Sequence, residues 1–171
     1  INSIASACMS KEEEADLWNR YSRYLSRVVT ELTEGEPVNQ EYMSRKIAVT
    51  KKWNGLIAID DFGAGYNSET VLLDMEPDII KVDMSLVQRI HEDPNRQLIL
   101  NNILDFAGQN HITVLAEGVE TKEELEFLIQ CGVELFQGYY IGRPQMEIRP
   151  IDPYIVRKMQ DFAQKSDFSQ K

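Results

Sequence analysis

The sequence alternates short β-rich runs with amphipathic helical segments along almost its whole length, and no other feature constrains the fold more. Strict alternation of this kind implies parallel strands that are connected by helical crossovers. The sequence shows no linker-like segment, low-complexity tract or short internal repeat. We therefore expect residues 1–171 to form a single α/β domain. The expected strands cover residues 1–5, 28–33, 56–60, 78–83, 112–117 and 134–139.

Several of the intervening segments carry helix signals. A last helix is expected over residues 153–164, and a set of apolar residues near the N-terminus has helical spacing: Trp18, Tyr21, Leu25 and Val28. Serine or threonine followed three residues later by glutamate is a capping box, and Asp-Pro places an N-cap before a proline at the first helical position. These start signals are Ser10 with Glu13, Thr121 with Glu124, and Asp93 with Pro94.

The parallel strands could form an open sheet or a barrel. An open sheet that binds a nucleotide should carry a GxGxxG turn or a P-loop, and this sequence has neither. Polar residues instead recur at the carboxyl ends of the expected strands, which is typical of a (β/α)8 barrel. Only about six βα units can be counted, so we predict a TIM-like barrel that is incomplete at its N-terminus. The strand-end residues are Asn2, Glu31, Asp60, Asp61, Lys81, Asp83, Glu117 and Gln137.

Charge and composition exclude some partners. The chain carries 28 acidic and 18 basic side chains, a formal net charge of -10, with 43% hydrophobic residues. This balance argues against binding to a nucleic-acid polymer or an anionic membrane surface. No apolar stretch approaches the roughly 18–20 residues that a membrane span needs. Cys8 and Cys131 have no metal-ligand spacing and are expected to be thiols in a reducing compartment, the cytoplasm.

Asp60 and Asp61 directly follow an apolar strand. Adjacent carboxylates repel each other, and strands disfavour aspartate. A helix N-cap would account for one of the two, whereas a divalent cation accounts for both, because it removes the repulsion and uses carboxylate oxygens as ligands. The pair therefore favours a metal site.

Other strand-end residues allow both functional and structural interpretations. Glu31 would point into the barrel mouth, although a helix cap or a surface acid is an alternative. Lys81 follows two isoleucines, and a buried ammonium is costly unless carboxylates surround it. It could also be a structural lysine that is paired with Asp83 or another acid. Glu117 ends an apolar strand and precedes a glycine.

Taken together, these acids, an amide and a lysine at one barrel face suggest a binuclear cation site. Two metal ions can clamp the attacking and leaving oxygens of a phosphoryl transfer. Oxygen ligands without histidine or cysteine favour Mg²⁺ or Mn²⁺ over Zn²⁺. Glu34 and Glu120 could equally be ordinary loop acids, and Gln137 is neutral and indicates little alone.

Five segments, in this order, resemble the motifs of the EAL domain, a family that hydrolyses the bacterial second messenger cyclic di-GMP. The resemblance spans residues 2–144 and leaves residues 145–171 as a C-terminal helix and tail. The segments are ELTE (31–34), DDFGAGYNS (60–68), PDIIKVD (77–83), LAEGVET (115–121) and QGYYIGRP (137–144).

The resemblance implies a role for each matching position. Asn2, Glu31 and Asp60 match ligands of a first metal ion. Asp60 would bridge to a second ion, which Asp61 and Glu117 would also bind. The implied reaction is in-line attack of activated water on one phosphodiester, which gives linear pGpG.

The remaining positions are implied to act directly or to support loops. Lys81 matches a lysine that holds or helps activate the water. It joins Glu117 and Gln137 as the expected catalytic residues. Loop support is expected from Glu34, Asp83 and Glu120.

The sequence also departs from the family pattern. The Glu-Ala-Leu motif and the arginine just after it do not precede Ile1, and Ala64 replaces the usual threonine. We expect a fragment that is weakly active or inactive, from a parent phosphodiesterase. A degenerate EAL domain that only binds cyclic di-GMP or a protein is the alternative, and another metal-dependent barrel lyase or phosphoesterase is a third reading. By resemblance, a homodimer and a fused sensory or GGDEF domain are plausible partners, and the parent could be membrane-anchored elsewhere.

Overall fold

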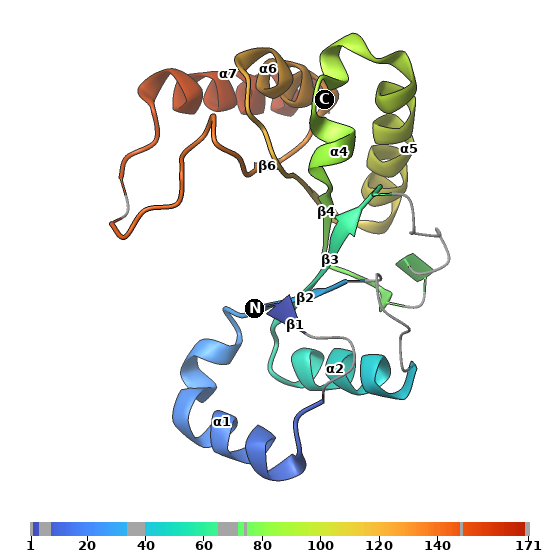
Figure 1. The fold of residues 1–171 in the computed structure, drawn as a ribbon, viewed down its shortest axis with the longest axis vertical. Helices are drawn as coiled ribbons and strands as arrows, with labels where there is room; N and C mark the ends of the chain where they lie inside the picture. The colour runs from blue at the N-terminus through green and yellow to red at the C-terminus, as the bar shows by residue number, and fades with distance from the viewer. Residues whose placement is uncertain are drawn as a thin grey trace. The chain divides into compact units, whose positions relative to one another are not determined.

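The structure is a computed structural model that describes residues 2–3, 8–33, 40–64, 72–73, 75–147 and 149–169. Figure 1 shows the alternation of strands and helices that the sequence predicts. The elements, in chain order, are β1 (Asn2–Ser3), α1 (Lys11–Leu25), β2 (Val29–Leu32), α2 (Gln40–Lys52), β3 (Leu56–Phe62), β4 (Ile79–Val82), α4 (Met84–Val87), the 3-10 helix η1 (Ile90–Glu92), α5 (Pro94–Asn110), β5 (Thr113–Ala116), α6 (Lys122–Cys131), β6 (Leu135–Phe136) and α7 (Pro153–Ser169).

The strands hydrogen-bond in sequence order, β1-β2-β3-β4-β5-β6. The pairs β1–β2, β2–β3 and β5–β6 are parallel, with Asn2 opposite Glu31 and Glu31 opposite Ala58. This order confirms the predicted α/β class with parallel strands. Apart from β1, the predicted first strand lies outside the described residues.

β2, β4 and β5 are each one residue shorter than predicted at both ends, and two other strands differ more from the prediction. β3 continues two residues beyond its predicted end at Asp60, so that Asp61 and Phe62 also lie in the strand. β6 ends at Phe136 instead of residue 139. It stops there because the amides of Ile141 and Gly142 donate to the carbonyl of Gly138 and turn the chain.

The chain forms two compact units, the first of which is Ile1–Lys81. In this unit α2 packs on β3, and consecutive β3 residues Ile57, Ala58 and Ile59 are all buried. A strand that is buried on both faces is typical of parallel sheets. The capping box of Ser10 and Glu13 begins α1 as predicted.

The apolar spacing at α1 was misleading, because it predicted a longer helix. α1 ends at Leu25, and Val28 lies beyond it. Leu25 is the buried residue of this helix, whereas Trp18 and Tyr21 are exposed. Aromatic residues at helical spacing therefore lie on the solvent side of α1.

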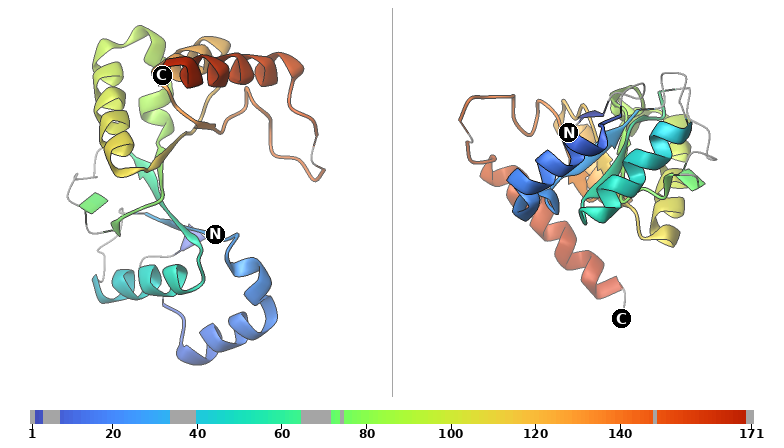
Figure 2. Two further views of the ribbon diagram at one scale, coloured as in Figure 1. Left: turned by 180° about the vertical axis from the view of Figure 1, so that it is seen from behind. Right: turned by 90° about the horizontal axis from the view of Figure 1, so that it is seen from below.

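The second unit, Val82–Lys171, contains α4 to α7 with β5 and β6. Its core includes Leu100 of α5, Val114 of β5 and Leu128 of α6. α7 lies beside α6 (Figure 2). α7 extends to Ser169, five residues beyond its predicted end. In the part of the chain that the structure describes, no helix combines the length and the apolar character needed to cross a membrane.

The predicted start signals of α5 and α6 are confirmed. Asp93 caps α5 by accepting hydrogen bonds from the Asn95 and Arg96 amides, and Pro94 occupies the first turn. Thr121 and Glu124 form a complete capping box at α6.

Candidate metal centre

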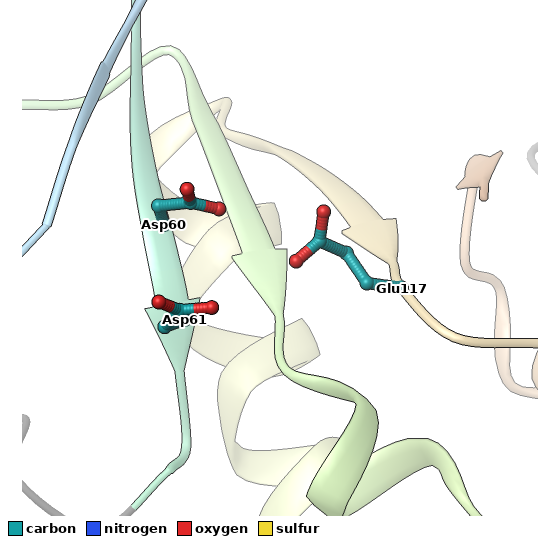
Figure 3. A group of neighbouring side chains, drawn as sticks. All are labelled: Asp60, Asp61 and Glu117. Carbon is teal, nitrogen blue, oxygen red and sulfur yellow. The ribbon is translucent and has the colours of Figure 1, made fainter. Parts of the chain in front are cut away.

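The two adjacent aspartates are positioned by β3. Its buried residues Ile57–Ile59 fix the strand, and the backbone of Asp61 then adopts a left-handed conformation with φ 55°. Aspartate tolerates this conformation better than most residues. The change interrupts the normal alternation of side chains along the strand. One carboxylate oxygen of Asp60 lies within 4.8 Å of one from Asp61. Figure 3 shows both side chains on β3.

Two negatively charged carboxylates at this separation repel each other. Asp60 is largely buried, with a side chain 14% exposed, whereas Asp61 is exposed. A bound cation would offset the repulsion between these two carboxylates.

Lys81 brings positive charge to the same strand ends. Its side chain, 10% exposed, extends from β4 and donates from Nζ to Oδ1 of Asp60 at 2.5 Å. The same Nζ lies 3.6 Å from Oε2 of Glu31, whose side chain is 25% exposed. Three consecutive strands therefore contribute to one ionic network, with Glu31 from β2, Asp60 from β3 and Lys81 from β4.

The open question about Lys81 is answered in favour of these partners over Asp83. Asp83 instead caps α4, because its Oδ1 accepts a hydrogen bond from the Ser85 amide at 2.9 Å. Burial of the ammonium is thus compensated by two carboxylates, as its cost requires.

In the second unit, Glu117 follows β5 and Gln137 follows β6. The Glu117 amide donates to the Val82 carbonyl at 3.0 Å, and the Gln137 amide donates to Ala116 at 2.8 Å. Backbone hydrogen bonds therefore hold both positions at strand ends. Glu117 is half-buried, and Gln137 is exposed. Among the described residues, the candidate metal ligands are Asp60, Asp61 and Glu117, each offering one carboxylate oxygen (Figure 3).

The structure describes less of the other predicted site residues. Glu34 lies outside the described residues. Asn2 is described by its backbone, which pairs with Glu31 in the β1–β2 register. Glu120 is exposed, and its amide donates to Oε2 of Glu124 at 2.9 Å.

Sequence reasoning missed a cavity of about 430 Å³ beside Gln137. Arg143, Arg149 and Glu147 are among its lining residues, so its wall carries both signs of charge. The guanidinium of Arg143 also lies over the Tyr139 ring, 4.3 Å from its centre. Arg143 belongs to the QGYYIGRP segment, but neither strand nor helix periodicity marks residues 143–149, so no pattern signalled the cavity.

The donor set of this centre consists of carboxylates, with no histidine or cysteine among the candidate ligands. Such oxygen donors fit a hard divalent cation rather than Zn²⁺. The fold is that of an α/β protein with parallel strands, and its described residues include a group of carboxylates that could hold a cation.

The chain belongs to the EAL domain family, whose model matches residues 6–144. One relative is the Escherichia coli K12 protein named probable cyclic di-GMP phosphodiesterase PdeG. It is 38% identical over 148 residues, which cover 84% of this chain and 29% of the relative. The chain thus spans less than a third of that relative's length.

Solved structures with the same fold include a standalone EAL protein from Vibrio cholerae O395 in a c-di-GMP-bound form. It is 34% identical with a TM-score of 0.81, and the match covers 91% of this chain and 68% of that one. BlrP1 from Klebsiella pneumoniae, in a complex with manganese and cyclic di-GMP, is also 34% identical. Its TM-score is 0.72, and the match covers 79% of this chain and 36% of BlrP1.

Proposed function

We propose that this chain is the larger part of a cyclic di-GMP phosphodiesterase domain, and that residues 1–171 act as one EAL domain of a longer protein. The reaction is hydrolysis of one phosphodiester of cyclic di-GMP to linear pGpG. The observation that carries the proposal is the network in which Lys81 is buried against Asp60 and Glu31, with Asp61 adjacent. EAL proteins of similar fold hold cyclic di-GMP, which supports this choice of substrate.

The proposed cofactor is Mg²⁺ or Mn²⁺, with two ions in the complete domain. Asn2, Glu31 and Asp60 would hold the first, and Asp60, Asp61 and Glu117 the second. The carboxylate donors fit these ions, and similar EAL proteins have been crystallised with manganese or calcium. When bound, the ions supply positive charge that lowers the pKa of water and neutralises the phosphate.

The protein's own residues position the reacting groups. Lys81, a donor anchored by Asp60, would hold or help to activate the attacking water, with Glu117 and Gln137 as the other proposed catalytic residues. A bond forms between the water oxygen and phosphorus while the bond from phosphorus to the leaving 3′-oxygen breaks. The leaving 3′-oxygen takes up one proton for the one that the attacking water gives up, so that atoms and charge balance.

Other predicted residues support this arrangement. Gln137 would line the water and metal pocket, and Glu34, Asp83 and Glu120 would support the loops. Asp83 has a supporting contact of this kind, since it caps the helix directly after β4. The proposed setting is the bacterial cytoplasm, with a homodimer and a fused sensory or GGDEF domain as proposed partners.

Comparison of this chain with a version extended upstream through a Glu-Ala-Leu segment tests the proposal. With Mg²⁺ or Mn²⁺ present, the extended version should form pGpG, and the 171-residue chain should form little or none. The physical reason is that a missing anionic ligand weakens the ion's hold, and small misplacements of reacting atoms cost rate heavily.

Two outcomes would contradict the account. Equal rates would mean that an upstream glutamate is dispensable for this mechanism. Binding of cyclic di-GMP without hydrolysis by the extended version would favour a degenerate domain that only binds the nucleotide.

A further inference from the structure

The segment from Glu117 to Thr121, which connects β5 to α6, is closely held by the second unit. The amide of Val119 donates to the Gln137 carbonyl at 3.1 Å, and its carbonyl accepts from the Tyr140 amide at 3.0 Å. Val119 is fully buried. These contacts fix the middle of the segment but leave the amides of its last two residues to be satisfied by other groups.

The carboxylate of Glu124 accepts those amides. Oε2 receives hydrogen bonds from Glu120 N at 2.9 Å and Thr121 N at 3.0 Å. Oε1 receives one from Arg89 N at 2.8 Å. Arg89 directly precedes η1 and has a left-handed backbone with φ 56°. The Glu124 carboxylate therefore connects the start of η1 to the segment 117–121.

This arrangement exceeds what a capping box requires. A capping-box glutamate needs to accept only the amide of the N-cap residue. Glu13 in α1 does this alone, by accepting from Ser10 N at 2.7 Å, and it is exposed. Glu124 is 3% exposed and accepts two further amides. Burying a carboxylate is costly, and here three backbone donors compensate the cost.

We propose that Glu124 is a positioning residue that holds the segment 117–121 in the conformation that presents Glu117 to the cation. This inference rests on the proposed function, in which Glu117 is a metal ligand. Groups that orient ligands in this way commonly alter metal affinity by about 10–100-fold when they are replaced.

The test uses residues 1–171 and the isosteric variant Glu124→Gln. An amide NH₂ in place of one oxygen would face backbone N–H donors and lose at least one hydrogen bond. We expect hydrogen exchange at the Glu120 and Thr121 amides to accelerate at least tenfold. We expect the affinity for Mn²⁺, measured by calorimetry, to fall about tenfold.

Two matched variants separate positioning from stability. Glu123→Gln removes an exposed carboxylate from the same helical turn and should change neither measurement. Ile129→Ala shortens a buried side chain on α6 and should lower the melting temperature without weakening Mn²⁺ binding. If Ile129→Ala weakens Mn²⁺ binding as much as Glu124→Gln does, then lost stability explains the effect and the inference is overturned.

The remaining outcomes distinguish the inference from the proposed function. Unchanged amide exchange in Glu124→Gln would overturn the inference directly. Faster exchange with unchanged Mn²⁺ affinity would also overturn it, provided that Glu117→Gln weakens binding. If Glu117→Gln leaves the affinity unchanged as well, the assignment of Glu117 as a metal ligand is what fails, and the positioning role fails with it.

Discussion

Asp60 and Glu124 are both carboxylates that the fold largely buries, but their partners differ in kind. Asp60 receives its short hydrogen bond from the Lys81 ammonium, at the end of a flexible side chain. Glu124 receives its three hydrogen bonds from backbone amides that the fold fixes in place. A metal ion can replace an ammonium as the positive charge beside a carboxylate, whereas it cannot replace backbone amides as hydrogen-bond donors. The first environment is suited to exchange of cations, and the second to rigid support.

Replacing the lysine should give the largest change in stability. Lys81→Met leaves Asp60 and Glu31 without their shared counter-charge, and we expect a loss of about 3 kcal/mol in unfolding free energy, as for broken buried ion pairs. Saturating Mn²⁺ should recover much of the loss, because the cation neutralises the same carboxylates. Denaturant titrations with and without MnCl₂ measure both effects.

The chain provides a matched control for this variant. Lys51 pairs with Glu76 at 2.7 Å, but both side chains are exposed. Exposed pairs contribute little, so Lys51→Met should change neither stability nor its response to Mn²⁺. A Lys81→Met protein that is as stable as the wild type would contradict the proposed difference between the environments of Asp60 and Glu124.

Glu124→Gln should give the second largest effect on stability. Leaving a buried backbone donor unsatisfied costs about 2 kcal/mol. Added Mn²⁺ should stabilise this variant no more than it stabilises the wild type, so the difference between the two proteins should remain, because the cation does not replace a hydrogen-bond acceptor. The same denaturant titration measures this, with the exposed capping-box variant Glu13→Gln as its control. A difference between Glu124→Gln and the wild type that disappears at saturating Mn²⁺ would contradict the division between exchangeable and fixed partners.

Removal of an N-cap hydroxyl should cost more stability at the part-buried Thr121 than at the exposed Ser10, and both losses should be smaller than that of Glu124→Gln. Thr121→Ala removes the acceptor of the part-buried Glu124 amide, and we expect a loss of about 1 kcal/mol. Ser10→Ala acts at an exposed helix start, where water can replace the hydroxyl, so its loss should be smaller. Thermal melts of both variants provide the comparison, and a larger loss in Ser10→Ala would reverse the expected order.

The smallest expected effect is the loss at low pH of the stability that the Glu124 carboxylate contributes. Burial raises the pKa of Glu124, but hydrogen bonds from Arg89, Glu120 and Thr121 together outweigh it and hold the pKa below the ordinary value of 4.5. A lowered folded-state pKa means that the carboxylate's stabilisation is complete above pH 4.5 and is lost as the pH falls through that lowered pKa. Urea titrations of wild type and Glu124→Gln should converge with decreasing pH. Parallel stability profiles would contradict this.

Local signals predicted the helix starts and most strands well. A capping box or an Asp-Pro pair acts through hydrogen bonds within one turn, so Ser10 and Asp93 needed no tertiary information. The apolar run that ends in Asp60 and Asp61 identified β3 for a similar reason. The parallel arrangement followed from the alternation of elements.

Features that depend on tertiary contacts could not be predicted in this way. The two capping boxes are equivalent in sequence, and only packing buries Glu124 while leaving Glu13 exposed. The helical spacing of Trp18 likewise did not show that its side chain is exposed. The sequence named Lys81 as a residue that needs acidic partners, but it left open which acids those are. The roles of the site residues remain predictions.

Calorimetric titration of the chain with Mn²⁺ tests the central claim most directly. The wild-type chain should bind the ion, and among Glu31→Gln, Asp60→Asn, Asp61→Asn and Glu117→Gln, the Asp60→Asn variant should lose the most affinity. Asp60 is the proposed bridging carboxylate, so its loss affects both ions. An Asp60→Asn protein with unchanged Mn²⁺ affinity would contradict the account of this centre.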